Sequence, residues 1–246
     1  MPVFFVSPQC VTPPTISITG DLLIHIRDSL RIAIGETLWV GDGEGTRHRV
    51  EIIDVSPKAV SGRILETIQE PLRRTPPLIL AQSLLKGEKM DWVIQKATEL
   101  GVDELIPLKS RHSVVQLKTD RVTHQLCRWQ RIALEAAQQS EQWHVPTIAQ
   151  PESLASLLTR KAIGTVTLML AERRNGKTLQ TVVLPQDVTG SVLVVIGPEG
   201  GWSQEEVQMA EQAGVVPVTL GQHILRSETA AIAAVSILQS RLGQMG

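Results

Sequence analysis

From residue 78 onward, short apolar runs alternate with stretches of helical spacing, and this alternation constrains the fold more than any other feature of the chain. Five runs have the apolar character of buried strands: LILAQ (78–82), ELIPL (104–108), TVTLML (165–170), VLVVIG (192–197) and VVPVTLG (215–221). Helical patterns occupy 88–101, 120–140, a stretch from Ser203, and 230–242. Strands that alternate with helices predict a mostly parallel sheet covered on both faces, so residues 71–246 are expected to form an α/β domain.

The first 70 residues have a different texture. Short runs such as ISI, ETLWV and RVEIIDV are separated by turn clusters, and GDGEG (41–45) is the plainest hairpin signal. We expect a small all-β domain over 1–70. The prolines of EPLRRTPP (70–77) suit a linker between this domain and the α/β domain.

Composition limits the class of protein. A chain of 246 residues with 42% hydrophobic content can bury a sizeable core. No apolar run approaches the roughly 18 residues that a membrane helix needs, and the first ten residues lack the features of a signal peptide, so we expect a cytoplasmic protein. Cys10 and Cys127 fit no metal-ligand spacing, which predicts reduced thiols and no metal site.

The charge is unevenly distributed although its net value is only −1. Residues 72–131 carry eleven Lys and Arg against six Asp and Glu, whereas residues 1–71 carry six against nine. The middle third can therefore present a local basic face. Ordinary solvated helix faces, with these cations paired to nearby carboxylates, explain the same counts.

The strand VLVVI runs into Gly197-Pro198-Glu199-Gly200-Gly201, and a helix is expected to begin after Ser203, which forms a capping-box pattern with Glu206. Ligands of open α/β sheets bind at this carboxyl end of the strands, where backbone N–H groups are unpaired and glycine permits close approach. A tight turn that needs positive φ is the alternative role for these glycines.

A second loop has the same position relative to its strand. VVPVTL is followed by LGQHILRSETAAIAAV (220–235), in which an apolar pair precedes Arg226. We expect the two strands to be neighbours, so that both loops line one pocket. The pattern is neither a dinucleotide fingerprint nor a triphosphate loop, and a nucleoside held by backbone groups and apolar contacts fits it better.

Both loops, IGPEGGWSQEE and LGQHILRSETAAIAA, resemble the paired signature of SPOUT-type methyltransferases, and most closely that of the bacterial 16S rRNA uridine N3-methyltransferase family. The blocks KGEKMDWVIQKATELGVDELIPL, RWQRIALEAAQQS and HIRDSLRIAIGETLWVGDGEG are also similar to that family. The resemblance covers nearly the whole chain.

The resemblance implies a PUA-like β-barrel, an RNA-binding domain, over residues 1–70. It also implies a SPOUT methyltransferase domain over 71–246, with a C-terminal trefoil knot and a homodimeric assembly. S-adenosylmethionine would bind in the knot, and 16S rRNA would be the partner. Carried onto this sequence, the cofactor site comprises Leu170, Gly197, Glu199, Gly200, Gly201, Leu220, Gly221, Ile224, Leu225 and Arg226.

Three positions depart from the family pattern. Gln222 and His223 stand where the family usually has Pro-Arg, and His112 stands where it often has Arg. A permanent positive charge is therefore lost in both places, close to where RNA is expected. His223 could assist proton removal, and a polar surface residue is the alternative.

Methylation of uracil N3 requires removal of its proton and stabilisation of the charge that spreads onto the ring oxygens. Arg226 is our candidate for charge stabilisation, because a guanidinium can donate to a ring oxygen. Glu228 is the candidate general base. Its alternative role is to place negative charge at the start of the last helix, which the helix dipole favours.

RNA contact is expected to rest on phosphates, because Trp, Phe and Tyr make up only 3% of the chain. Trp92 and Trp129 are expected to be core or dimer contacts. A ribose 2′-O-methyltransferase and a non-enzymatic RNA-binding assembly factor remain alternatives. The candidate RNA-binding residues are Arg27, Arg31, Lys86, Lys89, Arg111, Arg128 and Arg131.

Overall fold

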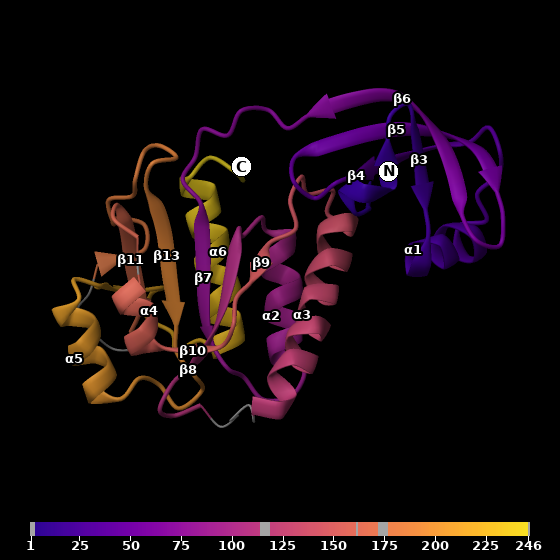
Figure 1. The fold of residues 1–246 in the computed structure, drawn as a ribbon. Helices are drawn as coiled ribbons and strands as arrows, with labels where there is room; N and C mark the ends of the chain where they lie inside the picture. Colours follow the sequence, from indigo (N-terminus) through magenta and orange to yellow (C-terminus); the bar gives the residue numbers. More distant parts are fainter. Residues whose placement is uncertain (1–2, 114–118, 161, 172–176, 246) are drawn as a thin grey trace. The chain divides into compact units, whose positions relative to one another are not determined.

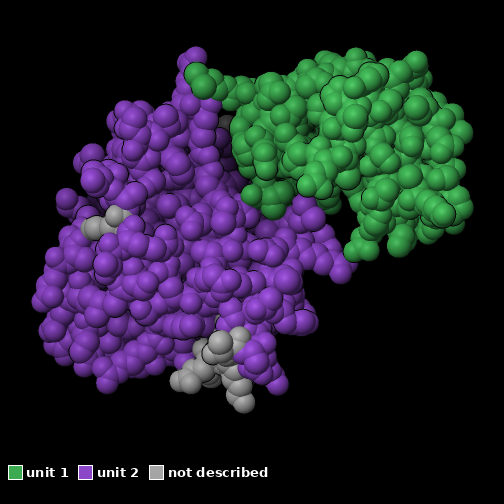
Figure 2. All heavy atoms as spheres, viewed as in Figure 1, with its two compact units in different colours: residues 1–72, 137–145 green, residues 73–136, 146–246 purple. Residues whose placement is uncertain are grey.

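The structure is a computed structural model that describes residues 3–113, 119–160, 162–171 and 177–245. Contacts divide the chain into two compact units (Figure 2). The first comprises residues 1–72 and 137–145, and the second comprises residues 73–136 and 146–246. No helix within the described residues is long and apolar enough to cross a membrane.

The first unit is built on a six-stranded sheet of strand order β1-β4-β5-β6-β3-β2, in which only the β1/β4 pair is parallel. This agrees with the predicted β-class domain. A short helical stretch between β3 and β4 was not predicted, because ten residues give little periodic signal. The elements are β1 (Val3–Phe5), η1 (Pro8–Cys10), β2 (Val11–Thr12), β3 (Thr15–Ile18), α1 (Gly20–Ile24), η2 (His25–Ser29), β4 (Thr37–Gly41), β5 (Thr46–Val55) and β6 (Val60–Gln69).

The predicted hairpin at 41–45 joins β4 to β5. The Asp42 carboxylate accepts hydrogen bonds from the backbone N–H groups of Glu44 (2.7 Å) and Thr46 (2.9 Å), which holds the turn closed. Alternate residues of the strands, such as Val50 and Ile52, are buried in the core of this unit. The hairpin thus follows from turn chemistry and strand alternation together.

Residues 137–145 add a late segment of the chain to this unit. The Arg47 guanidinium lies 3.8 Å from the centroid of the Trp143 ring and donates to the Glu141 carbonyl at 2.5 Å. Glu44 and His144 form an antiparallel bridge. The residues that make these contacts are about a hundred positions apart in sequence, so local sequence patterns did not predict the contacts.

The second unit contains a parallel sheet of strand order β10-β8-β7-β13-β11-β14-β12, with β9 also paired to β8 (Figure 1). This confirms the predicted α/β class. The segment 70–77 contains no helix or strand, as expected for a linker. The elements are β7 (Leu78–Ser83), α2 (Lys89–Glu99), β8 (Glu104–Lys109), α3 (Thr119–Gln139), β9 (Thr147–Ile148), β10 (Glu152–Ser153), α4 (Leu154–Arg160), β11 (Thr165–Leu170), β12 (Lys177–Thr178), β13 (Ser191–Ile196), α5 (Gln204–Gln212), β14 (Val216–Thr219) and α6 (Ser227–Arg241).

Helices cover both faces of this sheet. On one face Ala81, Leu193 and Val195 pack with residues of α4 and α5, in a single buried cluster. On the other face α6 contacts β7 and β13, and α2 packs against α6. Helix α4 was not predicted, since its seven residues make only two turns. Burial on both faces explains why the central strands are almost entirely apolar.

The expectation that β13 and β14 are neighbours is wrong, because β11 lies between them. The carboxyl end of β11 therefore lies between the ends of the two strands that carry the glycine loops. Sheet order depends on which strands pack together across long stretches of chain, and strand patterns alone do not specify it.

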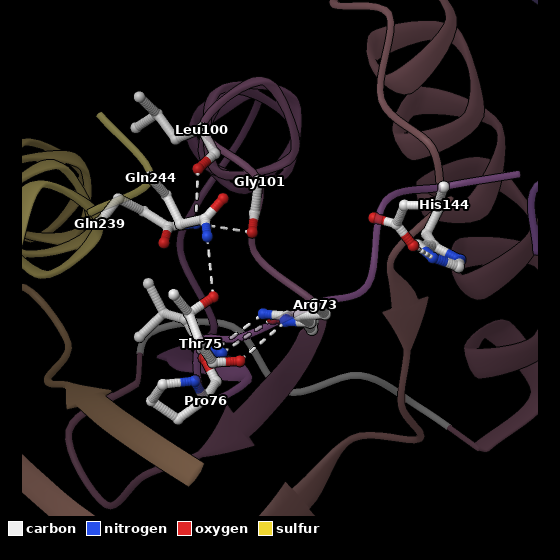
Figure 3. A network of polar contacts seen from close by, with 11 residues as sticks. Arg73, Thr75, Pro76, Leu100, Gly101, His144, Gln239 and Gln244 are labelled. Carbon is white, nitrogen blue, oxygen red and sulfur yellow. Dashed lines mark hydrogen bonds and ion pairs between the residues drawn. The ribbon is translucent and has the colours of Figure 1, made fainter. Parts of the chain in front are cut away.

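The end of α2 is joined to α6 by a buried glutamine. Gln239 Nε2 donates to the carbonyl oxygens of Leu100 (2.7 Å) and Gly101 (2.6 Å), so it satisfies two carbonyls that the end of α2 leaves free (Figure 3). Gln239 is 2% exposed. This pair of bonds fixes the position of α6 along α2.

We expect Gln239→Leu to lower the free energy of unfolding by about 1–3 kcal/mol, because it leaves both carbonyls without their donor. Urea unfolding followed by circular dichroism measures the change. Gln244→Leu is the matched control: Gln244 is exposed, and its side chain donates from Nε2 to Thr75 Oγ1 at 2.8 Å (Figure 3). Equal losses in the two variants would contradict a special role for Gln239.

Candidate active site

The first glycine loop is hydrogen-bonded to the start of α6 and to the end of β11. The Ser227 hydroxyl donates to the Gly197 carbonyl at 2.5 Å, and the Trp202 indole Nε1 donates to the Leu170 carbonyl at 2.9 Å. A Cβ added at Gly197 would lie 3.0 Å from the Trp202 ring. Glycine is needed here because the indole covers the backbone.

Glycine also serves the turn itself. The Gly201 N–H donates to the Pro198 carbonyl at 3.0 Å, and Gly201 has a φ of +71°. An added Cβ at Gly201 would meet no atom within 4 Å. The tight-turn role and the ligand role are therefore compatible at this loop, since the turn leaves open space beside its backbone.

The start of α5 has the predicted capping box. Ser203 Oγ accepts from the Glu206 N–H, and the Glu206 carboxylate accepts from the Ser203 N–H at 2.9 Å. The other Glu206 oxygen accepts from the Arg111 N–H, also at 2.9 Å. The loop after β8 is thereby attached to the start of α5.

His112 from that loop lies directly against the double glycine. Its Nδ1 is 3.1 Å from the Gly201 carbonyl, and its Cβ would lie 2.9 Å from a Cβ added at Gly200. The sequence marked His112 only as a departure from the family pattern. The structure shows it to be a neighbour of the loop expected to hold the cofactor.

The second loop begins with a turn at Gly221, which has a φ of +127° and open space around its Cα. Thr219 Oγ1 accepts from the Gly221 N–H at 3.2 Å. Ile224 is 55% exposed, so its apolar side chain lies at the surface of this loop. The loop thus presents open backbone and apolar surface next to the end of the sheet.

Arg226 is the N-cap residue of α6 and is exposed. Among the described residues its guanidinium forms no ion pair or side-chain hydrogen bond. A guanidinium without a carboxylate partner is available to a ligand. His223 is also exposed, and both of the roles considered for it remain predictions.

Glu228 lies in the first turn of α6, as both of its expected roles require. Its side chain is 15% exposed, and Oε2 is buried without a hydrogen-bond partner within the described part of the chain. Oε1 lies 3.5 Å from Lys89 Nζ, and the same ammonium is ion-paired with Glu199. These contacts raise the pKa of Lys89, chiefly through its hydrogen bond to Glu199.

Two residues of this region had not been singled out. The buried Gln82, at the end of β7, donates from Nε2 to Ser227 Oγ at 3.0 Å, and its Oε1 has no partner among the described residues. Its signal was available, because Gln82 is a polar residue at the carboxyl end of an apolar strand. Ser227 directly follows Arg226, but its bond to Gly197 depends on the fold.

The other candidate RNA-binding residues are distributed differently. Lys86 is exposed and has no ion pair among the described residues. Arg31 is exposed with a φ of +53°. The remaining four are paired with carboxylates: Arg27 with Asp28 (2.6 Å), Arg111 with Glu205 (3.0 Å), Arg128 with Asp91 (2.5 Å) and Arg131 with Glu135 (2.9 Å).

The two tryptophans on helices differ in burial. Trp129 is 2% exposed and donates from Nε1 to the Asp91 carboxylate at 3.1 Å, so it is a core residue. Trp92 is 43% exposed and is not part of the core. Its expected dimer contact remains a prediction.

Comparison with known families identifies the class of protein that this fold and this loop arrangement define. The RNA methyltransferase domain family matches residues 73–239, and the RNA methyltransferase PUA domain family matches residues 18–65. Both glycine loops and helix α5 lie within the larger match, and α6 begins within it.

The chain belongs to the family of ribosomal RNA small subunit methyltransferase E. It is 33% identical to that protein of Bacillus subtilis over 94% of this chain and 91% of the relative. The corresponding protein of Neisseria gonorrhoeae, solved bound to S-adenosyl methionine, has a TM-score of 0.88 and 29% identity over 98% of both chains. A putative methyltransferase of Legionella pneumophila, solved with bound SAM, has a TM-score of 0.86 and 29% identity over 98% of this chain and 96% of that one.

Proposed function

We propose that this protein methylates N3 of a uridine in 16S rRNA of the small ribosomal subunit, with S-adenosylmethionine as cofactor. The observation that carries the proposal is the convergence of two open glycine loops on the end of β11, beside Glu228 and an Arg226 that has no ion pair among the described residues. Family membership and the SAM-bound relatives support the cofactor and the class of RNA.

The residues fit this cofactor. The backbones at Gly201 and Gly221 face open space, which suits close approach of a nucleoside and an amino-acid moiety. Leu170, Leu220, Ile224 and Leu225 supply apolar surface at the same edge of the sheet. Bound S-adenosylmethionine supplies an electrophilic methyl group on a sulfonium ion.

The chain's own groups then act on the uracil. The Glu228 carboxylate accepts the N3 proton, and the exposed Arg226 guanidinium stabilises the negative charge that spreads to the ring oxygens. Exposed cations on both units bind phosphates. We also propose that the C-terminal chain forms the trefoil knot of the family and that the protein is a homodimer.

The test is methylation of 16S rRNA, as naked RNA and as assembled subunit, followed by nuclease digestion and mass spectrometry of nucleosides. We expect N3-methyluridine. A ribose 2′-O-methylated product, recognised by a nuclease-resistant linkage, would overturn the base assignment. Absence of cofactor binding by calorimetry would favour a non-enzymatic assembly factor.

The homodimer has a separate test. We expect light scattering at micromolar concentration to give twice the chain mass of 26.9 kDa. A monomer mass under these conditions would contradict the assembly proposal, and it would leave the proposed reaction unaffected.

A further inference from the structure

The amino end of α2 carries a lysine that is engaged by two carboxylates from distant parts of the chain. Lys89 Nζ is ion-paired with Glu199 of the first glycine loop and lies 3.5 Å from Glu228 Oε1 of α6. The Lys89 side chain is 35% exposed. A lysine that binds RNA phosphates along a surface needs a free ammonium, and this ammonium already has two anionic partners.

Glu228 needs such a cation. Its side chain is 15% exposed, and a carboxylate taken that far out of water is costly unless a charge or hydrogen bonds compensate it. Within the part of the chain that the structure describes, Lys89 is the cation paired with it. The pairing engages Oε1, and the buried Oε2 has no hydrogen-bond partner among the described residues, so Lys89 is the group that compensates this carboxylate.

The position of Lys89 relative to Glu228 is fixed by helix packing. Helices α2 and α6 both begin at the edge of the sheet where the strands end. At their far ends Gln239 holds the Leu100 and Gly101 carbonyls (Figure 3). The separation in sequence from Lys89 to Leu100 equals that from Glu228 to Gln239. The Lys89–Glu228 contact and the Gln239–Leu100 contact therefore keep one register along a parallel helix pair.

We infer that Lys89 is the positioning residue of the catalytic carboxylate: it holds Glu228 by Oε1 and couples it to Glu199 of the cofactor loop. The inference rests on the proposed function. In the reaction the N3–H bond breaks and the proton passes to the Glu228 carboxylate, while the electron pair of that bond stays on nitrogen. That pair forms the new N–C bond to the methyl group, and the cofactor's sulfur keeps the S–C pair as a thioether.

The experiment is a double-mutant cycle on the full-length protein, with Lys89→Met, Glu228→Gln and the double variant. Single-turnover methylation is measured at saturating RNA and cofactor. We expect Lys89→Met to slow methylation by about tenfold or more in the parent. In the Glu228→Gln background it should change the rate by less than about twofold, because residues that act as a unit are not additive.

Two further variants separate positioning from RNA contact. Lys89→Arg keeps a cation and should retain most of the rate. Lys89→Met should leave the salt dependence of RNA affinity as in the parent. Lys86→Met should remove one phosphate contact, which reduces the slope of log affinity against log salt concentration by about 0.7 for single-stranded RNA. Lys86 is the matched comparison, because it is exposed and lies three residues away.

The inference is overturned if the rate loss of the double variant equals the product of the rate losses of Lys89→Met and Glu228→Gln. It is also overturned if Lys89→Met flattens the salt dependence of RNA affinity and leaves the methylation rate unchanged. Thermal melts verify that the variants fold. If Lys89→Met does not fold, Glu199→Gln is used instead, because it removes the other partner of the Lys89–Glu199 ion pair. In that case, a Glu199→Gln rate within twofold of the parent overturns the inference. If the parent yields methylated RNA without N3-methyluridine, the base assignment fails, and the cycle is read on the product that forms.

Discussion

Arg226→Met is expected to slow single-turnover methylation of small-subunit RNA by on the order of a hundredfold or more. The variant keeps much of the side-chain length and removes the charge that, in the proposed mechanism, stabilises the uracil oxygens in the transition state. Arg226 is exposed at the start of α6 and forms no ion pair among the described residues, so the substitution removes no internal contact of that kind. The fold should therefore be retained.

Arg226→Lys separates charge from geometry, because it keeps the positive charge and loses the planar fork of donors. We expect an intermediate rate. Cofactor affinity by calorimetry should fall far less than the rate in both variants, since the donor acts on charge that develops during the reaction. If Arg226→Met methylates within a few-fold of the parent, Arg226 is structural and His223 becomes the residue to test.

Gly200→Val is expected to lower cofactor affinity by about 5- to 150-fold. This range corresponds to the roughly 1–3 kcal/mol that overpacking of a close contact costs. A Cβ at this position would lie 2.9 Å from the His112 Cβ and 3.5 Å from the His112 carbonyl oxygen. The first glycine loop must therefore move away from His112, or the new side chain must occupy the open space beside the loop where the cofactor is expected. Gly200 is exposed, so the core of the unit should be unaffected.

Calorimetric titration with S-adenosylmethionine measures the loss, and Gly214→Ala is the matched control. Gly214 follows α5, has a φ of +72°, and would meet no atom within 4 Å, so it reports backbone strain away from the loop. The loss of affinity can come from displacement of the loop by His112 or from direct contact of the new side chain with the cofactor. Gly200→Ala is therefore compared with the double variant Gly200→Ala/His112→Gly. Higher affinity in the double variant assigns the loss to loop displacement, and equal affinity assigns it to direct contact with the cofactor. Unchanged affinity in Gly200→Val would remove Gly200 from the site.

Local features of the site were accessible from the sequence because they depend on residues a few positions apart. The capping box of Ser203 and Glu206 and the hairpin turn around Asp42 formed as their spacing predicts. The strand–helix alternation likewise predicted the parallel sheet, and the placement of both glycine loops at strand ends followed from it. The wrong expectation concerned the neighbours of β13, which no local pattern specifies.

The sequence by itself thus determined the two structural classes, the approximate positions of the longer helices and strands of the second unit, and the two loops of the candidate site. Only the tertiary structure placed β11 between these loops, His112 against Gly200, and Lys89 between Glu199 and Glu228. The physical reason is the range of the interactions. Turns and caps are hydrogen bonds within a few residues, whereas these contacts join side chains about 90 to 140 positions apart, which only sheet order and helix packing bring together.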